Sequence, residues 1–191
     1  MESTLQTSVN PKKLALNNGL IWAAINIAIF LVVYYVKPDW MGSFAFSGIQ
    51  ILIGIGLAIY FCMDIRKKIG GYWSFKEALG SIFLMFFVQA LIVFFFTIIF
   101  AKYIEPGYAV KMKEIVSTST QDMLEKMGMD QEKIDQAIAD SEERLERQFN
   151  PGFKEVAIGL ATIAIMYFIG ALIFAAIFKK DPPVFLGNSE D

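Results

Sequence analysis

Four long runs of residues without a charged side chain constrain this chain more than any other feature. They cover residues 14–36, 44–63, 78–100 and 156–178, and their interiors contain no Asp, Glu, Lys or Arg. A helix needs about 20 apolar residues to cross about 30 Å of hydrocarbon, and each run has that length. The chain is also 55% hydrophobic, more than is typical of a soluble domain. The pattern therefore predicts an all-α, polytopic membrane protein with a bundle of four transmembrane helices.

The other segments are two polar tails, a basic turn and one long insert. We expect residues 1–13 and 181–191 to form the tails, and the second tail, which contains Pro182 and Pro183, to be disordered. Transmembrane helices 1–3 are predicted within residues 14–101, with the basic turn at 64–77, and the fourth helix within 153–180. The first run is longer than the core of a signal peptide and is not followed by a small-x-small cleavage site, so we expect it to be retained.

The insert at residues 102–152 is predicted to form an acidic helical hairpin outside the membrane. Pro-Gly pairs follow Glu105 and Asn150, and proline favours the first turn of a new helix. Two stripes recur at helical spacing: Met112, Val116, Ser119, Met123 and Met127, then Ile134, Ile138, Ser141, Leu145 and Phe149. Because the stripes hold few large residues, we expect them to leave a surface for a partner, and methionine suits an adaptable contact. Salt pairs are expected between Asp140 and Arg144 and between Glu143 and Arg147, four residues apart.

Residue type suggests how the spans pack. Seven phenylalanines in the third span, at positions 83, 86, 87, 94, 95, 96 and 100, are expected to face lipid. The fourth span is rich in Gly and Ala, and pairs of small residues four apart, Ala157 with Ala161 and Ala171 with Ala175, allow helices to approach closely. We therefore expect the fourth helix to be the packed centre of the bundle.

The basic residues beside the spans predict the orientation of the chain. Eight of them are predicted at one face: Lys12, Lys13, Arg66, Lys67, Lys68, Lys76, Lys179 and Lys180. Only Lys37, Lys102 and Lys154 flank the spans at the other face. Because cytoplasmic loops carry the excess of Lys and Arg, we expect a bacterial inner-membrane protein with both termini cytoplasmic and the hairpin periplasmic. The cluster Arg66, Lys67, Lys68 and Lys76 could also attract anionic lipid headgroups, and Asp64 is expected to pair with the first three of these cations.

Polar residues near the middle of the spans are predicted to form a layer at one depth. Asn26, Gln89 and Tyr167 supply hydrogen-bonding groups, and Gly54 and Gly56 offer a surface for close approach. One interpretation is structural, since such bonds fix the register of membrane helices. The other is a substrate or ion site between helices, although the spans contain no carboxylate to bind a cation or relay protons.

The amino-acid composition argues against several classes of function. The chain has no histidine and one cysteine, Cys62, which removes the usual zinc, haem and Ser-His or Cys-His sites. No catalytic motif or metal spacing is present, so we expect a non-enzymatic protein without a cofactor. Basic residues form no stripe away from the membrane flanks, which argues against a nucleic-acid partner. The lipid bilayer is the first partner, and the hairpin is expected to contact a membrane or periplasmic protein or a second copy of the chain. The alternative is a small transporter or channel that works through the polar layer.

The basic junction also carries a family resemblance. The run DIRKKIGGYWSFKEALGS at residues 64–81 contains the pattern R-x3-GG-x3-F-x-E-A, and the insert ends in FNPGFKE at residues 149–155. With the four spans, these features resemble the bacterial membrane family catalogued as domain of unknown function 4199, over about residues 12–180. The resemblance implies a four-helix inner-membrane protein, and it implies no activity, cofactor or site residues.

Overall fold

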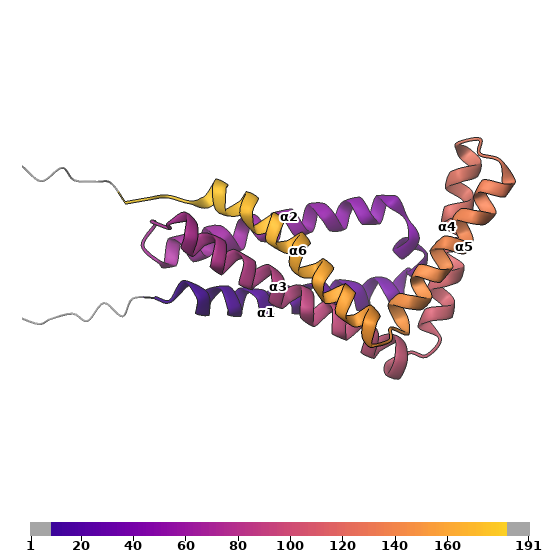
Figure 1. The fold of residues 1–191 in the computed structure, drawn as a ribbon, viewed down its shortest axis with the longest axis horizontal. Coiled ribbons are helices and arrows are strands. Elements are labelled where there is room, and N and C mark those ends of the chain that lie inside the picture. The colour runs from indigo at the N-terminus through magenta and orange to yellow at the C-terminus, as the bar shows by residue number, and fades with distance from the viewer. Residues whose placement is uncertain (1–8, 183–191) are drawn as a thin grey trace, which may run out of the picture.

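Four long helices form an elongated bundle in which two of them run at an angle to the others, and a hairpin of two shorter helices lies at one end (Figure 1). The computed structural model describes residues 9–182; the predicted tails beyond this range, including most of the predicted disordered segment, lie outside the described residues. The elements in order are α1 (Pro11–Val36), η1 (Pro38–Gly42), α2 (Phe44–Lys68), α3 (Phe75–Ile99), η2 (Phe100–Ile104), α4 (Tyr108–Lys126), α5 (Gln131–Phe149) and α6 (Phe153–Phe178). The predicted all-α fold is confirmed.

Local sequence sets where the first three long helices begin. Asn10, Ser43 and Ser74 precede α1, α2 and α3, and the side-chain oxygen of each accepts a hydrogen bond from a backbone N–H in the first turn. Such caps satisfy amide groups that have no partner within the helix. After α2 the chain turns at Gly70 and Gly71, whose φ angles of +94° and +88° are accessible to glycine and costly for other residues.

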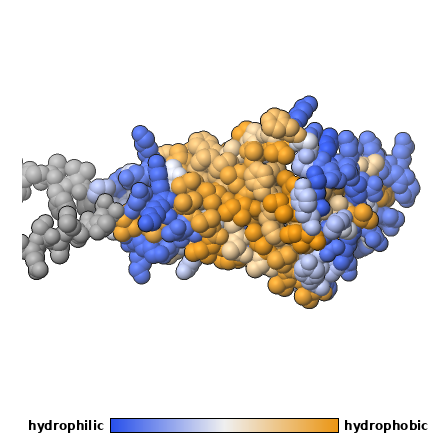
Figure 2. All heavy atoms as spheres, turned by 90° about the horizontal axis from the view of Figure 1, so that it is seen from below, coloured by the Kyte–Doolittle hydropathy of each residue, from blue (hydrophilic) through white to orange (hydrophobic). Residues whose placement is uncertain are grey.

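The four long helices carry a continuous apolar surface. Figure 2 shows it as a broad hydrophobic band between two hydrophilic ends. Large apolar side chains in the band are exposed, among them Leu52 at 71%, Ile165 at 62% and Ile177 at 65%. Each of the four helices is long and apolar enough to cross a bilayer, so this band is the surface that meets lipid. The chain is a multi-pass membrane protein.

The packed centre of the bundle is α3, and the expectation that the fourth membrane helix, α6, fills this place is wrong. α3 packs against α1 on one side and α6 on the other. Its buried residues are Ala78, Ser81, Ile82, Met85, Phe86, Gln89 and Ala90, whereas α6 buries only Ala171, Ala175 and Phe178. The small pair Ala171 and Ala175 is fully buried as predicted, but Ala157 and Ala161 are exposed.

The phenylalanines of α3 explain this difference. The rings of Phe86 and Phe94 lie over Gly170 and Gly159 of α6: a Cβ atom added at either glycine would meet the ring at 3.6 Å or 3.2 Å. Large side chains of α3 thus pack over the small residues of α6, and the other faces of α6 are exposed to lipid. Within residues 75–104, Phe86 and Phe100 are buried and Phe95 is the one exposed phenylalanine besides Phe75 at the start of the helix. The prediction that these rings face lipid is therefore wrong for the buried ones.

α2 is attached to the bundle mainly through one half. Its C-terminal half buries Ala58, Phe61, Cys62 and Ile65, whereas residues 47–57 contain no buried side chain. In Figure 1 α2 lies apart from α1 along the half that begins at η1. Half of one wall of the bundle is therefore only lightly packed.

The contact of α1 with α3 depends on Gly19. A Cβ atom at this position would lie 2.8 Å from the backbone oxygen of Met85, which cannot move without displacing α3. We expect Gly19→Ala to lower the free energy of unfolding by about 1–3 kcal/mol, the usual cost of overpacking. Unfolding in detergent, followed by tryptophan fluorescence, measures this change.

Gly56→Ala is the matched control for that experiment. A Cβ atom at Gly56 meets no atom within 4 Å, so this substitution is expected to be neutral or slightly stabilising, because alanine favours a helix over glycine. Equal effects of the two substitutions would contradict the close α1–α3 contact.

Candidate functional site

A chain of hydrogen bonds crosses the middle of the bundle. The amide Nδ2 of Asn26 in α1 donates to Oε1 of Gln89 in α3 at 2.9 Å, and Nε2 of Gln89 donates to the hydroxyl of Tyr167 in α6 at 3.1 Å. Gln89 is 4% exposed. The structure thus brings together the three polar residues of the predicted layer, and it places Gln89 at the centre because its amide can donate and accept at once.

The predicted layer also included two glycines of α2, Gly54 and Gly56, but neither lies against another helix. A Cβ atom at Gly54 or Gly56 would meet nothing within 4 Å, so neither mediates a close helix contact, and that expectation is wrong. The reason is the separation of this half of α2 from the other helices. Gly54 instead lines a cavity, together with Gln50 one turn earlier. Sequence analysis missed Gln50, although it is the one amide side chain within the second apolar run.

Two cavities meet at the hydrogen-bonded layer. The larger, of about 470 Å³, lies between α2 and the other three long helices. The smaller, of about 280 Å³, extends toward the hairpin and reaches Gln148 of α5. Asn26, Gln89 and Tyr167 line both. Neither lining contains a charged residue, and a membrane cavity with only neutral polar groups suits a neutral ligand, because an ion would lose its hydration without gaining a counter-charge.

The basic residues gather at the end of the bundle opposite the hairpin. Trp73, after the glycine turn, exchanges two backbone hydrogen bonds with Lys180, of 2.7 and 2.8 Å, which fasten the end of α6 to the α2–α3 turn. The predicted pairing of Asp64 is confirmed for Lys68, which donates to its carboxylate at 2.8 Å, and is wrong for Arg66 and Lys67. Asn18 of α1 donates to the same carboxylate at 3.3 Å. The guanidinium of Arg66 lies over the ring of Phe178, 5.9 Å from its centre.

The remaining cations of the cluster are exposed. Lys67 and Lys76 point away from the packed core, and Lys68 keeps half of its side chain exposed beside Asp64. The side chains of Lys67 and Lys76 therefore remain accessible to anionic headgroups or water. Sequence analysis missed Asn18, which is 5% exposed; the only signal was an amide at the start of an apolar run.

An aromatic cluster joins the hairpin to the bundle. Tyr108 at the start of α4 packs edge-on against Phe30 and Tyr34 of α1, Phe100 of η2 and Phe149 at the end of α5, with ring centres 5.0–5.6 Å apart. Burial raises the pKa of the Tyr108 hydroxyl well above its ordinary value, and the nearby Tyr34 raises it further. Such edge-to-face pairs contribute about 0.5–1.5 kcal/mol each beyond their buried area, so the base of the hairpin is firmly held.

The η1 turn provides a second attachment of the hairpin. A Cβ atom at Gly42 would lie 2.7 Å from side-chain atoms of both Ile115 and Ser119 of α4. This is the close glycine contact that was expected at Gly54 and Gly56. The hairpin is therefore fixed to α1, η1 and η2 and covers that end of the bundle.

Within the hairpin, the two predicted stripes face each other. Met112, Ile134 and Phe149 are buried, whereas Met127 at the tip is 69% exposed. The expectation that the stripes leave an apolar surface for a partner is thus wrong except at the tip, since the stripes are covered by the facing helix and, at Ser119, by η1. Of the two predicted salt pairs, Glu143 with Arg147 forms at 3.4 Å, but Nε of Arg144 donates to the backbone oxygen of Asp140 instead of its carboxylate.

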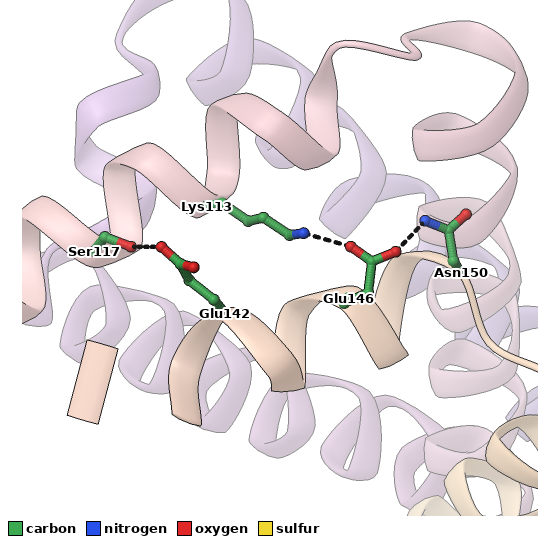
Figure 3. A network of polar contacts seen from close by, with 5 residues as sticks. All are labelled: Lys113, Ser117, Glu142, Glu146 and Asn150. Carbon is green, nitrogen blue, oxygen red and sulfur yellow. Dashed lines mark hydrogen bonds and ion pairs between the residues drawn. The ribbon is translucent and has the colours of Figure 1, made fainter. Parts of the chain in front are cut away.

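Polar contacts join the exposed edges of the two hairpin helices. Lys113 of α4 forms an ion pair with Glu146 of α5, whose carboxylate also accepts from Asn150 at 2.9 Å, and Ser117 donates to Glu142 at 3.0 Å (Figure 3). The pKa of the Glu146 carboxyl lies below its usual range. The hydrogen bond from the Lys113 ammonium lowers it most, and the hydrogen bond from the Asn150 amide lowers it further. Within residues 9–182 no group of three His, Cys, Asp or Glu side chains could hold a metal ion.

Comparison with known proteins identifies the family. The model of the family described as "Protein of unknown function (DUF4199)" matches residues 17–180, which include most of α1, the other three membrane helices and the hairpin. The chain belongs to the DUF4199 family. Neither the curated proteins nor the solved structures gave a significant match. The match to the DUF4199 family assigns no activity or site residue to this chain.

The hydrogen-bonded layer predicts a specific loss of stability. Gln89→Leu removes both interhelical bonds, each contributing about 0.6–1.7 kcal/mol in a membrane helix bundle, and we expect the free energy of unfolding to fall by about 1–3 kcal/mol. Tyr167→Phe removes one bond and should cost about half as much. Gln50→Leu serves as the control, because no hydrogen bond joins this side chain to another described residue. If Gln50→Leu were as costly as Gln89→Leu, the layer would not fix the helices.

The Lys113–Glu146 pair predicts a pH dependence of the hairpin. Because the folded state lowers the pKa of Glu146, the contribution of this carboxylate to stability is present above the ordinary carboxyl pKa of about 4 and is lost as pH falls through the lower, folded value. The difference in melting temperature between the parent protein and Glu146→Gln should thus shrink in acid. Glu132→Gln removes an exposed carboxylate outside this network and should show no such trend in matched melting curves.

Proposed function

We propose that this DUF4199 protein is a non-enzymatic protein of a bacterial inner membrane, with both termini in the cytoplasm and the α4–α5 hairpin in the periplasm. The start of α1, the α2–α3 turn and the end of α6 lie together at the end opposite the hairpin (Figure 1). These three segments carry the eight basic residues that flank the spans, so the positive-inside rule supports this orientation.

The role that the geometry favours is recognition of another protein by the hairpin. The observation that carries this proposal is the firm attachment of a solvent-exposed element: the aromatic cluster around Tyr108 and the contact of Gly42 with α4 hold the hairpin in one position on the bundle. A surface held in advance loses little conformational entropy when it binds. The hairpin therefore acts as a fixed platform at the membrane surface.

The outer face of α5 is the binding surface of this platform. Residues 103–152 contain 11 acidic and six basic side chains. Glu132, Asp140 and Glu143 are exposed on the side of α5 opposite the buried Ile134, and Asp135 is exposed on the adjoining side. Glu143 pairs with Arg147, whereas Glu132, Asp135 and Asp140 form no ion pair with a described residue. Complementary charge steers and orients protein association. The partner is accordingly a membrane or periplasmic protein with a basic surface.

Site-specific crosslinking tests the platform. A photo-crosslinking residue at Ala139, which lies among these acids, is expected to capture a partner in intact cells, because the acidic face is where contact occurs. The triple variant Glu132→Gln, Asp135→Asn, Asp140→Asn should reduce the adduct at least about tenfold, since rim charges mainly set association rates. A dimer-sized adduct would identify a second copy of the chain as the partner.

Two controls make this result interpretable. Neutralising Glu114, Asp122 and Glu125 removes three exposed charges from α4 and should leave the adduct in place. A cysteine at Asp135 in a Cys62→Ser background should react with an impermeant maleimide in intact cells, whereas one at Lys76 should react only after lysis. An adduct insensitive to the α5 charges would contradict the platform, and the opposite labelling pattern would contradict the orientation.

A further inference from the structure

The larger cavity next to the hydrogen-bonded layer has the features of a binding site that the hairpin proposal does not use. Its volume of about 470 Å³ lies within the usual range of small-molecule sites. It lies between membrane helices, beside Gln89 at the centre of the bundle. A molecule reaching this depth must be soluble in lipid.

The polar groups that line the cavity are neutral and have unused donor protons. Gln89 uses one amide proton on Tyr167, and Asn26 uses one on Gln89, so each retains a second. The hydroxyl proton of Tyr167 and the amide of Gln50 make no hydrogen bond to the described residues. These side chains therefore carry donor protons that no described residue uses, and a ligand that offers oxygen acceptors without charge would satisfy them.

Aromatic side chains form much of the rest of the lining. Trp22, Phe30, Phe86 and Phe174 contribute, and Trp22 meets Phe86 edge-on at 5.5 Å, as Phe86 meets Phe174 at 5.4 Å. Trp22 and Phe86 are themselves 5% and 4% exposed, so these rings form a packed aromatic wall on one side of the cavity. Aromatic walls favour a planar ring through offset or edge-to-face contact. An acyl chain would fit the apolar lining equally well, but it would leave the amide donors without partners.

The α2 wall gives such a molecule access from the bilayer. Residues 47–57 of α2 contain no buried side chain, and no atom lies within 4 Å of a Cβ built at Gly54, which lines the cavity. Entry from the side avoids crossing either polar end of the protein. It also suits a ligand that is concentrated in the membrane.

We propose that this cavity binds a neutral, lipid-soluble molecule whose planar ring carries hydrogen-bond-accepting carbonyl oxygens, the chemical class of the membrane quinones. The ring lies among Trp22, Phe86 and Phe174, and its carbonyl oxygens accept from Gln50 and from the free donors of the Asn26–Gln89–Tyr167 layer. Binding requires neither passage across the membrane nor the partner of the hairpin. The two proposals can therefore fail separately.

Tryptophan fluorescence offers a direct test, because quinones quench indole emission and Trp22 lines the cavity. The full-length protein in phosphatidylcholine nanodiscs is titrated with decyl-benzoquinone. We expect a saturable quenching component above the linear component due to partitioning into lipid. Trp22→Phe, which leaves Trp40 and Trp73, should lose the saturable part.

Two glycines of α2 provide matched variants. Gly54→Leu places a side chain in the cavity and should weaken saturable binding at least about tenfold, whereas Gly56→Leu on the same helix lies outside the lining and should not. Gln50→Leu removes one donor without breaking a helix contact and should weaken binding roughly tenfold, the effect of losing one hydrogen bond.

The decisive comparison uses decylbenzene, which has the same tail and a planar six-membered carbon ring without carbonyl oxygens. If the proposal holds, it fails to displace the quinone at equal concentration. Purely linear quenching of the parent protein, or equal displacement by decylbenzene, would overturn the proposal and show a cavity that takes hydrocarbon without selection. Loss of binding in Gly56→Leu as well as in Gly54→Leu would also count against the assigned site.

Discussion

The close packing of α3 with its two neighbours is the contact on which the rest of the structure depends. In lipid, apolar surface gives helices little reason to associate, and close van der Waals contact and hydrogen bonds must hold them together. α3 meets both needs: Gly19 lets α1 reach its backbone at Met85, its rings enter the space above the glycines of α6, and Gln89 bonds to both helices. α2 has none of these contacts along residues 47–57, and that half of the helix is accordingly exposed.

The same contrast explains what could be predicted from sequence. The number, length and ends of the membrane helices follow from hydrophobicity, capping residues and glycine turns, which are local properties. Pairing of helices is not local. The small residues of α6 indicated close packing correctly at Ala171 and Ala175, but they could not show that the packed partner, α3, supplies the large side chains and therefore occupies the centre.

The candidate site shows a similar division. Asn26, Gln89 and Tyr167 were found from their depth alone, because polar groups in an apolar span must find partners. Gly54 and Gly56 were misjudged because glycine marks close approach only where another helix is present, and Gly42 and Gly19 have that role instead. Gln50 and Asn18 were missed because their roles depend on segments far apart in sequence. Gln50 lines a cavity between α2 and the other long helices, and Asn18 of α1 donates to Asp64 of α2.

The hairpin and the midplane layer share their mechanical support. Phe30 and Tyr34 of the aromatic cluster lie one and two turns after Asn26 on α1, and Phe100 follows Gln89 on α3 and its η2 extension. A displacement of the hairpin would therefore act directly on α1 and α3, the two helices that the Asn26–Gln89 hydrogen bond joins. α2 connects to the hairpin end through η1 and its buried Phe46, and to the basic end of the bundle through the buried residues Ala58, Phe61, Cys62 and Ile65. The cavity-lining segment of α2, residues 50–55, therefore lies between two packed ends of the helix and takes no part in the hydrogen-bonded layer.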